Sequence, residues 1–490
     1  EICACLVGSE MCIRDSLKIF IMKLKYYFLF FVLSLLASCN DEEGLDLHNK
    51  PIESNSIVLS PDEYISIAYD NPRVITPDEA KQLALDFGVN RVQTRGNENI
   101  VVKFRSSFNI EEKGSNAVTR SVTDKSILLP VYEMEIVSDA GKGLAYVSAD
   151  ERVAKVMAYL PKVNLEDTAK IIGAKAMLGL SEQSLLEEAK HYEKMKLEFR
   201  DETLKRISKE LNVAAVNFNE IKDRILVEDC LDSRATPQDP AGNAIGWAGF
   251  FCMATNWDQE PVYNDLLEKA YCAPNVGKEP VYKAVPAGCS VVAMAQIMAS
   301  LEPNLTIDGI KIDWEALKAQ PQILMPLPWK PNQGSPEIVR TMVAKLFKHI
   351  YDLSGTHPEY DKTTNWVTGS GTSGPQTRDF LRRYFTTGDL INGWDGNAAF
   401  LSLQKAKLVW VGVSDASKKA SHAFVIDGFA YWRPQTRYLV KNFDFYFRAN
   451  MGWAGSYDGF YLVNKDMSIS FEAGGYELNT GFNMICDIIL

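Results

Sequence analysis

The sequence has little of what metal and nucleic-acid sites need. It holds five histidines, and its nine cysteines form neither a CxxC pair nor a His/Cys cluster with zinc spacing. Lysine and arginine total 52 against 63 acidic residues, which gives a formal net charge of −11. Because phosphate binding needs a basic face, we expect no nucleic-acid partner. We also expect no metal and no other cofactor.

The sequence around Tyr26–Leu36 lacks the length of a membrane-spanning helix, which takes about 20 apolar residues. This short apolar run follows Met22 and two lysines, as in the hydrophobic part of a signal peptide. It ends at Leu36-Ala37-Ser38-Cys39, which matches a bacterial lipobox. We therefore expect residues 22–39 to be a lipoprotein signal peptide and Cys39 to be lipidated. The alternative is a plain secretory signal.

The flanking residues extend this interpretation. Residues 1–21 precede the expected start and are interpreted as a non-native leader. The acidic run at 40–43 resembles the surface-export signal of bacterial lipoproteins. We expect an envelope protein anchored by lipid in the outer membrane, with exposure at the cell surface as one arrangement, or a protein released outside the cell.

The length of 490 residues predicts two to four domains. Residues 40–70 are polar and are expected to form a tether, and residues 71–165 a small α+β unit. That unit opens with a helix at Thr76-Pro77 and continues with alternating strands around a turn at 139–143. Residues 166–245 contain a charged, amphipathic helix from Ser181 to Leu211. Residues 246–490 pass from helical to strand-rich patterns, which predicts an α+β fold with segregated lobes.

Five cysteines remain once the leader and the lipobox are set aside: Cys230, Cys252, Cys272, Cys289 and Cys486. An odd number leaves one thiol free even if the others pair. Cys252 with Cys272 is a candidate disulfide.

Cys289 carries the clearest chemical signal. It directly precedes a long apolar run that predicts a buried helix. A thiol at a helix N-terminus faces unpaired N–H groups and the positive end of the dipole, so we expect the thiolate to be favoured. His422 lies far downstream, in the order that papain-like cysteine hydrolases show. We expect the two side chains to meet in a groove between two lobes.

Six motifs in order carry a family resemblance. They are WDQEPVYN from Trp257, AGCSVVAMAQIM from Ala287, IDWEAL from Ile312, TGSGTSGPQTRDFLRRYF from Thr368, SHAFVIDGF from Ser421 and NMGWAGSYDGFYLV from Asn450. Together they resemble streptopain-like cysteine peptidases, which have a papain-like fold with a helical lobe and an antiparallel β lobe. GLAYVSADERVAKVMAYLPK, within the unit 71–165, resembles the inhibitory prodomain of that family.

The resemblance implies roles for individual residues. Cys289 would attack the peptide carbonyl, His422 would transfer protons, and Gln259 would donate hydrogen bonds to the oxyanion. Asn450 is the candidate that orients the histidine. The substrate cleft would be lined by Trp453, Gly371, Ser373, Gly374 and Ser421.

The sequence departs from the family pattern at two places. Met451 stands where the family has the first tryptophan of Asn-Trp-Gly-Trp, and Ala420-Ser421 stand where glycine usually precedes the histidine. We therefore keep two alternatives beside the leading hypothesis of a cysteine endopeptidase zymogen. One is a weak or inactive homologue that acts as a binding or inhibitory lipoprotein. The other is a papain-like transferase or amidase.

The leading hypothesis defines the partners. They are protein or peptide substrates, the prodomain in cis, and the membrane through the lipid anchor. The segment 166–245 would be cut on activation. The resemblance also implies an apolar side chain two positions before the scissile bond.

Overall fold

The structure, a computed structural model, describes most of the chain. The described residues are 56–92, 99–111, 127–139, 141–164, 172–227, 247–251, 253–274, 279–326, 329–330, 333–414, 421–432, 444–463 and 481–490. The chain divides into the units Glu1–Ile57 and Val58–Leu490, and the second unit holds both the predicted prodomain and the predicted catalytic region. The predicted leader, signal peptide and lipidated Cys39 lie outside the described residues, as do most of the tether and Cys252.

The second unit begins with helices and strands in the region of the predicted prodomain. They are α2 (Pro61–Ala68), α3 (Pro77–Val92), β2 (Val101–Glu111), β3 (Leu128–Ser138), β4 (Gly141–Ser148), η1 (Glu151–Val153) and β5 (Val156–Leu160). The predicted helix at Thr76-Pro77 and the paired strands around 139–143 are confirmed. Ser60 caps α2 through a capping box with Glu63.

A long helix follows and leads to short elements. They are α4 (Ile172–Leu211), α5 (Phe218–Ile221), η3 (Lys222–Arg224) and β6 (Ile225–Val227). The amphipathic helix predicted from Ser181 is thus confirmed, but it begins earlier, at Ile172. The sequence before Ser181 is rich in small residues, which hid the start of the helix from a pattern based on charge.

The remaining elements form the predicted catalytic region. The first are β7 (Trp247–Phe251), β8 (Lys269–Cys272), β9 (Val281–Ala284), α6 (Cys289–Leu301), β10 (Thr306–Ile307), β11 (Ile310–Lys311), α7 (Trp314–Lys318), α8 (Glu337–Leu353), β12 (His357–Tyr360), β13 (Val367–Gly371) and α9 (Gly374–Leu381). The others are β14 (Leu390–Asn392), α10 (Gly396–Gln404), β15 (Leu408–Ser414), β16 (Ser421–Trp432), β17 (Asp444–Asn450), β18 (Gly459–Val463) and β19 (Gly481–Ile488).

One antiparallel sheet of 11 described strands is the scaffold. Its order is β14-β19-β15-β16-β17-β18-β5-β4-β3-β2, and β7 pairs with β16. The strands of the predicted prodomain continue the catalytic strands where β18 pairs with β5, through Phe460↔Tyr159 and Tyr461↔Ala158. Aromatic rings cross this junction, with Phe87 of α3 against Tyr446 and Phe460. The two regions therefore share a sheet and a core.

The helical lobe centres on α6, an apolar helix that is buried from Ser290 to Ala299. It packs on β16 of the sheet and on α8. Helices combined with antiparallel strands confirm the predicted α+β class. The segregation into lobes is incomplete, because a second sheet, β12-β13-β8-β9, contacts α6 through β13, and α10 packs on β15, β16 and β19. Cys272 is a free, buried thiol. The candidate disulfide with Cys252 is therefore not present in this structure.

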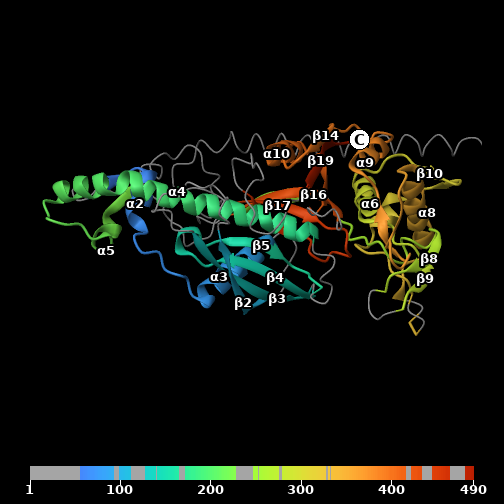
Figure 1. Ribbon diagram of the computed structural model, residues 1–490, viewed down its shortest axis with the longest axis horizontal. Helices are drawn as coiled ribbons and strands as arrows, with labels where there is room; N and C mark the ends of the chain where they lie inside the picture. The colour runs from blue at the N-terminus through green and yellow to red at the C-terminus, as the bar shows by residue number, and fades with distance from the viewer. Residues whose placement is uncertain are drawn as a thin grey trace, which may run out of the picture. The chain divides into compact units, whose positions relative to one another are not determined.

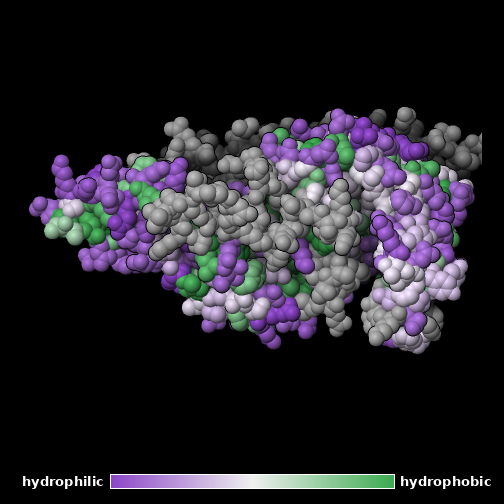
Figure 2. Space-filling model, viewed as in Figure 1, coloured by the Kyte–Doolittle hydropathy of each residue, from purple (hydrophilic) through white to green (hydrophobic). Residues whose placement is uncertain are grey.

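Helix α4 lies across the sheet, as Figure 1 shows, with contacts to β5, β15, β16 and β18. The buried ammonium group of Lys155 connects α4 to the sheet. Lys155, after η1, donates to Glu188 of α4 at 2.5 Å and to Asp444 of β17 at 2.7 Å. Among the described residues, no helix is both long and apolar enough to cross a bilayer. The face shown in Figure 2 is largely hydrophilic, with scattered hydrophobic patches.

Candidate active site

Cys289 is the first residue of α6, as predicted, and Gly288 is its N-cap. Gly288 has φ 91°, and a Cβ built on it would lie 2.6 Å from the carbonyl oxygen of Ser370 in β13. Only glycine satisfies both conditions. The close approach brings the end of β13 against the helix start, so the glycine-rich segment predicted to line the cleft does lie beside Cys289.

The sulfur of Cys289 contacts the strand that carries His422. Sγ accepts a hydrogen bond from the backbone N–H of Ala423 at 3.2 Å. The N–H groups of Ala423 and Ser290 lower the pKa of the thiol, but burial has the larger effect and raises it. The expectation that the helix N-terminus favours a thiolate is therefore wrong for this state of the protein, because loss of solvent outweighs the N–H groups.

His422 is buried beside an aromatic ring. Its ring centroid lies 4.0 Å from that of Trp453, at an interplanar angle of 30°. Nε2 lies 2.9 Å from the carbonyl oxygen of Met451. A carbonyl only accepts, so Nε2 carries the proton and Nδ1 is the basic nitrogen. Burial lowers the pKa of His422 to about 3, and the Met451 carbonyl offsets this only in part.

The thiol and the imidazole are therefore both neutral here. Their described hydrogen bonds go to Ala423 and to Met451 rather than to each other. Helix α4 lies against the imidazole, because a Cβ on Gly173 would lie 2.5 Å from Cδ2 of His422. The site thus holds a half-buried thiol and a buried imidazole, and desolvation disfavours the charged form of each.

Asn450 is buried, but its amide is committed elsewhere. Oδ1 accepts from Nε2 of Gln296 at 2.9 Å and from the Gly452 N–H at 3.1 Å. Nδ2 donates to the carbonyl of Thr255 at 2.8 Å. Asn450 does not bond His422 directly. Asn450 instead bonds the N–H of the peptide between Met451 and Gly452. The carbonyl of that peptide, which belongs to Met451, accepts the hydrogen bond from His422.

A backbone hydrogen bond places Gln259 near Cys289. Its carbonyl accepts from the N–H of Ala287 at 3.0 Å, two residues before Cys289. This fixes the loop of Gln259 beside the start of α6, where an oxyanion donor belongs. The structure gives its side chain no described role.

The residues predicted to line the cleft are spread over several elements of the structure. Trp453 covers His422, and Ser421 is exposed at the start of β16. Ser373 is the N-cap of α9 and forms a capping box with Gln376. Gly374 is the first residue of that helix, and Gly371 ends β13 beside Glu359. Ser373 therefore has a structural duty that the sequence did not reveal.

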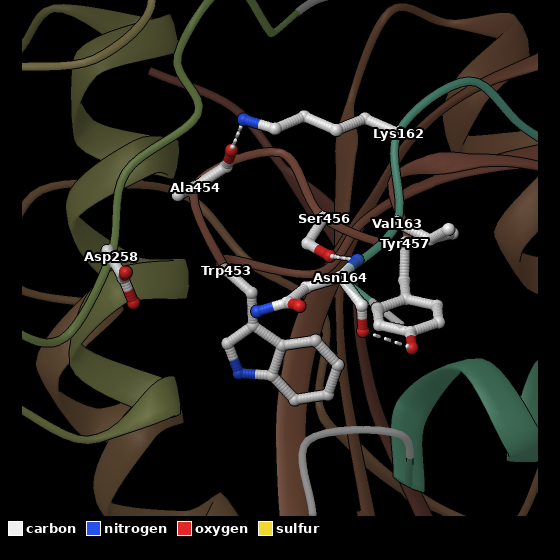
Figure 3. A pocket seen from close by; sticks show the side chains of 8 residues that line it. All are labelled: Lys162, Val163, Asn164, Asp258, Trp453, Ala454, Ser456 and Tyr457. Atoms are coloured by element: carbon white, nitrogen blue, oxygen red, sulfur yellow. Dashed lines mark hydrogen bonds between the residues drawn. The ribbon is translucent and has the colours of Figure 1, made fainter. Parts of the chain in front are cut away.

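A pocket of about 340 Å³ lies next to Trp453 (Figure 3). Its walls come from both predicted domains: Lys162, Val163, Asn164, Asp258, Trp453, Ala454, Ser456 and Tyr457. Lys162 donates to the carbonyl of Ala454 at 2.8 Å, and the Asn164 N–H donates to Ser456 Oγ at 2.8 Å. The segment that follows β5 is thus hydrogen-bonded to the loop at 454–456, which comes directly after Trp453.

Sequence reasoning missed four contributors to the site. The Met451 carbonyl and Gly173 contact His422 directly, whereas Gln296 bonds Asn450 and Asp458 bonds the N–H of Met451. Gln296 carried a signal, because a glutamine inside an apolar helix needs buried partners. The Met451 carbonyl and Gly173 carried none, since their roles depend on the backbone or on a missing side chain, and nothing in the sequence around Asp458 marked its carboxylate as buried.

Comparison with known proteins gives the class. Residues 257–461 match the model of the peptidase C10 family. The predicted resemblance to streptopain-like cysteine peptidases is confirmed over this stretch, which carries both Cys289 and His422.

The structure is also similar to a solved fragment of prointerpain A from Prevotella intermedia. The two share 16% sequence identity with a TM-score of 0.39, over 79% of this chain and 99% of that chain. No curated protein matches the sequence.

Proposed function

We propose that this protein is the zymogen of a cysteine endopeptidase, in which Cys289 attacks a peptide carbonyl and His422 exchanges the proton. The observation that carries the proposal is the contact of Cys289 Sγ, at the start of α6, with the N–H of Ala423, the neighbour of His422. In the proposed reaction the sulfur bonds to the carbonyl carbon, and the thiol proton passes to Nδ1 of His422. The leaving amine takes that proton when the acyl-enzyme forms, and water then releases the acyl group.

Burial supports a latent state. An active pair needs thiolate and imidazolium, and both charged forms are disfavoured when water is excluded. Helix α4 covers the imidazole through Gly173, and burial lowers the pKa of His422 to about 3. Removal of α4 would return water to the site and restore the charged pair.

The segment after β5 supports obstruction of the cleft. Lys162 and Asn164 are hydrogen-bonded to the loop at 454–456, beside Trp453. Peptides that bind along this loop would compete with them. We infer that the region 71–165 inhibits in cis and that activation cuts the chain within 166–245.

We further propose that the protein reaches the cell envelope through its signal peptide and is lipid-anchored at Cys39, or is released outside the cell. Its substrates would be proteins or peptides, with an apolar side chain two positions before the scissile bond. The two alternative functions, an inactive binding homologue and a transferase or amidase, predict different outcomes in the same assay.

The test is active-site labelling of the chain from residue 40 to 490. After processing, the protein is treated with a stoichiometric epoxide inhibitor of papain-like enzymes and its modified residue is found by mass spectrometry. We expect modification of Cys289 alone, and its loss in His422→Ala. Labelling no faster than that of a small thiol would instead support the inactive homologue.

Two further readouts separate the enzyme classes. Hydrolysis of casein supports the peptidase, whereas hydrolysis of peptidoglycan alone supports the amidase. Cys289→Ala should block self-maturation, and unchanged processing in that variant would show that another protease cuts the precursor.

A further inference from the structure

Asp458 is a buried carboxylate whose contacts lead to the catalytic histidine. It lies between β17 and β18 and is 6% exposed. Its Oδ1 accepts the N–H of Met451 at 2.6 Å. The carbonyl of the same residue accepts from Nε2 of His422 at 2.9 Å. Two hydrogen bonds through the backbone of one residue therefore connect the carboxylate to the imidazole.

The backbone of Met451 is held on both sides. Asp458 holds the peptide that precedes it, and Asn450 Oδ1 holds the N–H of Gly452 in the peptide that follows. Within the second peptide, the bonded N–H of Gly452 polarises the Met451 carbonyl, whereas Asp458 acts on this carbonyl by fixing the position of Met451. These contacts use the backbone alone. The presence of methionine where the family has tryptophan does not remove them.

Asp458 is also placed among other charges. Arg448 of β17, Asp427 of β16 and Lys162 after β5 face it, and Tyr461 of β18 lies close enough to be affected by it. Burial raises the pKa of Asp458 to about 7, against the effect of Arg448. Its Oδ2 has no hydrogen-bond partner within the described part of the chain. A buried acid with a single hydrogen-bonded oxygen is costly to retain for packing alone.

We propose that Asp458 is a positioning residue for His422, because it fixes the backbone of Met451 so that the Met451 carbonyl keeps the proton of His422 on Nε2. Nδ1 is then left as the nitrogen that takes the proton of Cys289. This reaction step rests on the proposed peptidase function. The hydrogen-bonded relay from Asp458 to His422 is testable without any activity.

The first test reads the tautomer of His422 by NMR. The full-length chain carrying Cys289→Ala is labelled with ¹³C,¹⁵N-histidine, and His422→Gln assigns the signal among the five histidines. We expect the Nε2–H tautomer with a slowly exchanging proton. Asp458→Asn keeps an acceptor oxygen and should keep this tautomer. Asp458→Ala should exchange the proton about ten-fold faster and mix the tautomers.

The matched control is Asp427→Ala. Asp427 is buried nearby and also accepts a backbone N–H, that of Met253, but its described hydrogen bonds go to Met253 and Arg448 rather than to Met451. Its loss should leave the His422 signal unchanged. A folded Asp458→Ala protein with the wild-type tautomer and exchange rate would overturn the proposal.

The second test covers the case in which Asp458→Ala does not fold. In the same Cys289→Ala background, the milder variant Asp458→Ser shortens the acceptor that holds the Met451 N–H, so the Nε2 proton of His422 should exchange faster than in the protein with Asp458. A folded Asp458→Ser protein with an unchanged exchange rate would overturn the proposal. An inactive wild type would contradict the proposed function instead, and the tautomer would still decide the role of Asp458.

Discussion

Gly173 of α4 and His422 of β16 lie so close that a Cβ on the glycine would sit 2.5 Å from Cδ2 of the imidazole. The same Cβ would lie 3.0 Å from Sδ of Met451. Only a residue without a side chain lets the helix cover the ring at this distance. The contact therefore explains how a segment outside the matched residues 257–461 can exclude water from His422.

Gly173→Ala should weaken this cover. The added methyl group forces α4 or the ring to move, and overpacking of this kind costs about 1–3 kcal/mol. We expect epoxide labelling of Cys289 in the unprocessed precursor to become roughly ten-fold faster. Gly179→Ala, on the same helix, controls for the gain in helix propensity and should leave the rate unchanged. Equal rates in the two variants, measured by intact mass, would show that the contact does not restrain the site.

The stability of the precursor should fall on acidification because of His422. Its pKa is about 3 in the folded protein and about 6.5 when unfolded, so the unfolded chain binds more protons between these values. The free energy of unfolding should therefore drop as the pH falls from 7 to 4, with about 3 kcal/mol due to His422.

Urea denaturation of Cys289→Ala and of the double variant with His422→Gln, each followed over pH, isolates the contribution of His422 to the free energy of unfolding. Asp427 and Asp458 have raised pKa values and act in the opposite direction, but they are common to both proteins and cancel in the difference. The pH dependence should be smaller in the double variant. If the free energy of unfolding changed equally with pH in both variants, His422 would already be solvated in the precursor.

Local patterns made much of the fold predictable. The capped start at Thr76-Pro77, the alternation in 128–137 and 422–432, and the apolar run after Cys289 each specify an element through its own period. The pairing of β18 with β5 was not predictable. Tyr159 and Phe460 are apolar strand residues that suit many partners, and their register is set by packing between distant segments.

The site was predictable where side chains carry the chemistry. Cys289 and His422 are recognised by type and order, although their roles remain predictions until tested. Contacts through the backbone left no trace in the sequence, as with the Met451 carbonyl. The cover over His422 likewise depends on Gly173 of α4, which lies far from His422 along the chain.

Asn450 and Gln296 should be energetically coupled. The amide of Asn450 accepts from Gln296 and both are buried, so removal of either leaves unsatisfied groups and costs about 1–3 kcal/mol. In a double-mutant cycle with Asn450→Leu and Gln296→Leu, we expect a coupling of about 0.5–3 kcal/mol by urea denaturation. Additive effects would show that the two amides act independently.

Lys155 should hold the predicted prodomain and α4 to the catalytic sheet. Lys155→Met leaves Asp444, which is 9% exposed, without this partner, and should lower the unfolding free energy by about 3 kcal/mol. Lys194→Met removes an exposed pair with Glu198 on α4 and should change it by less than about 0.5 kcal/mol. If the two variants were equally stable, the buried ion pair would not secure the interface.

The most direct measurement is the pH dependence of iodoacetamide alkylation of Cys289 in the matured enzyme and in its His422→Ala variant. We predict a reactive thiolate in the matured wild type well below the ordinary cysteine pKa of about 8.5, and a return to that value in the variant. A single transition near 8.5 in both proteins would show that His422 does not activate Cys289, and would contradict the proposed peptidase mechanism.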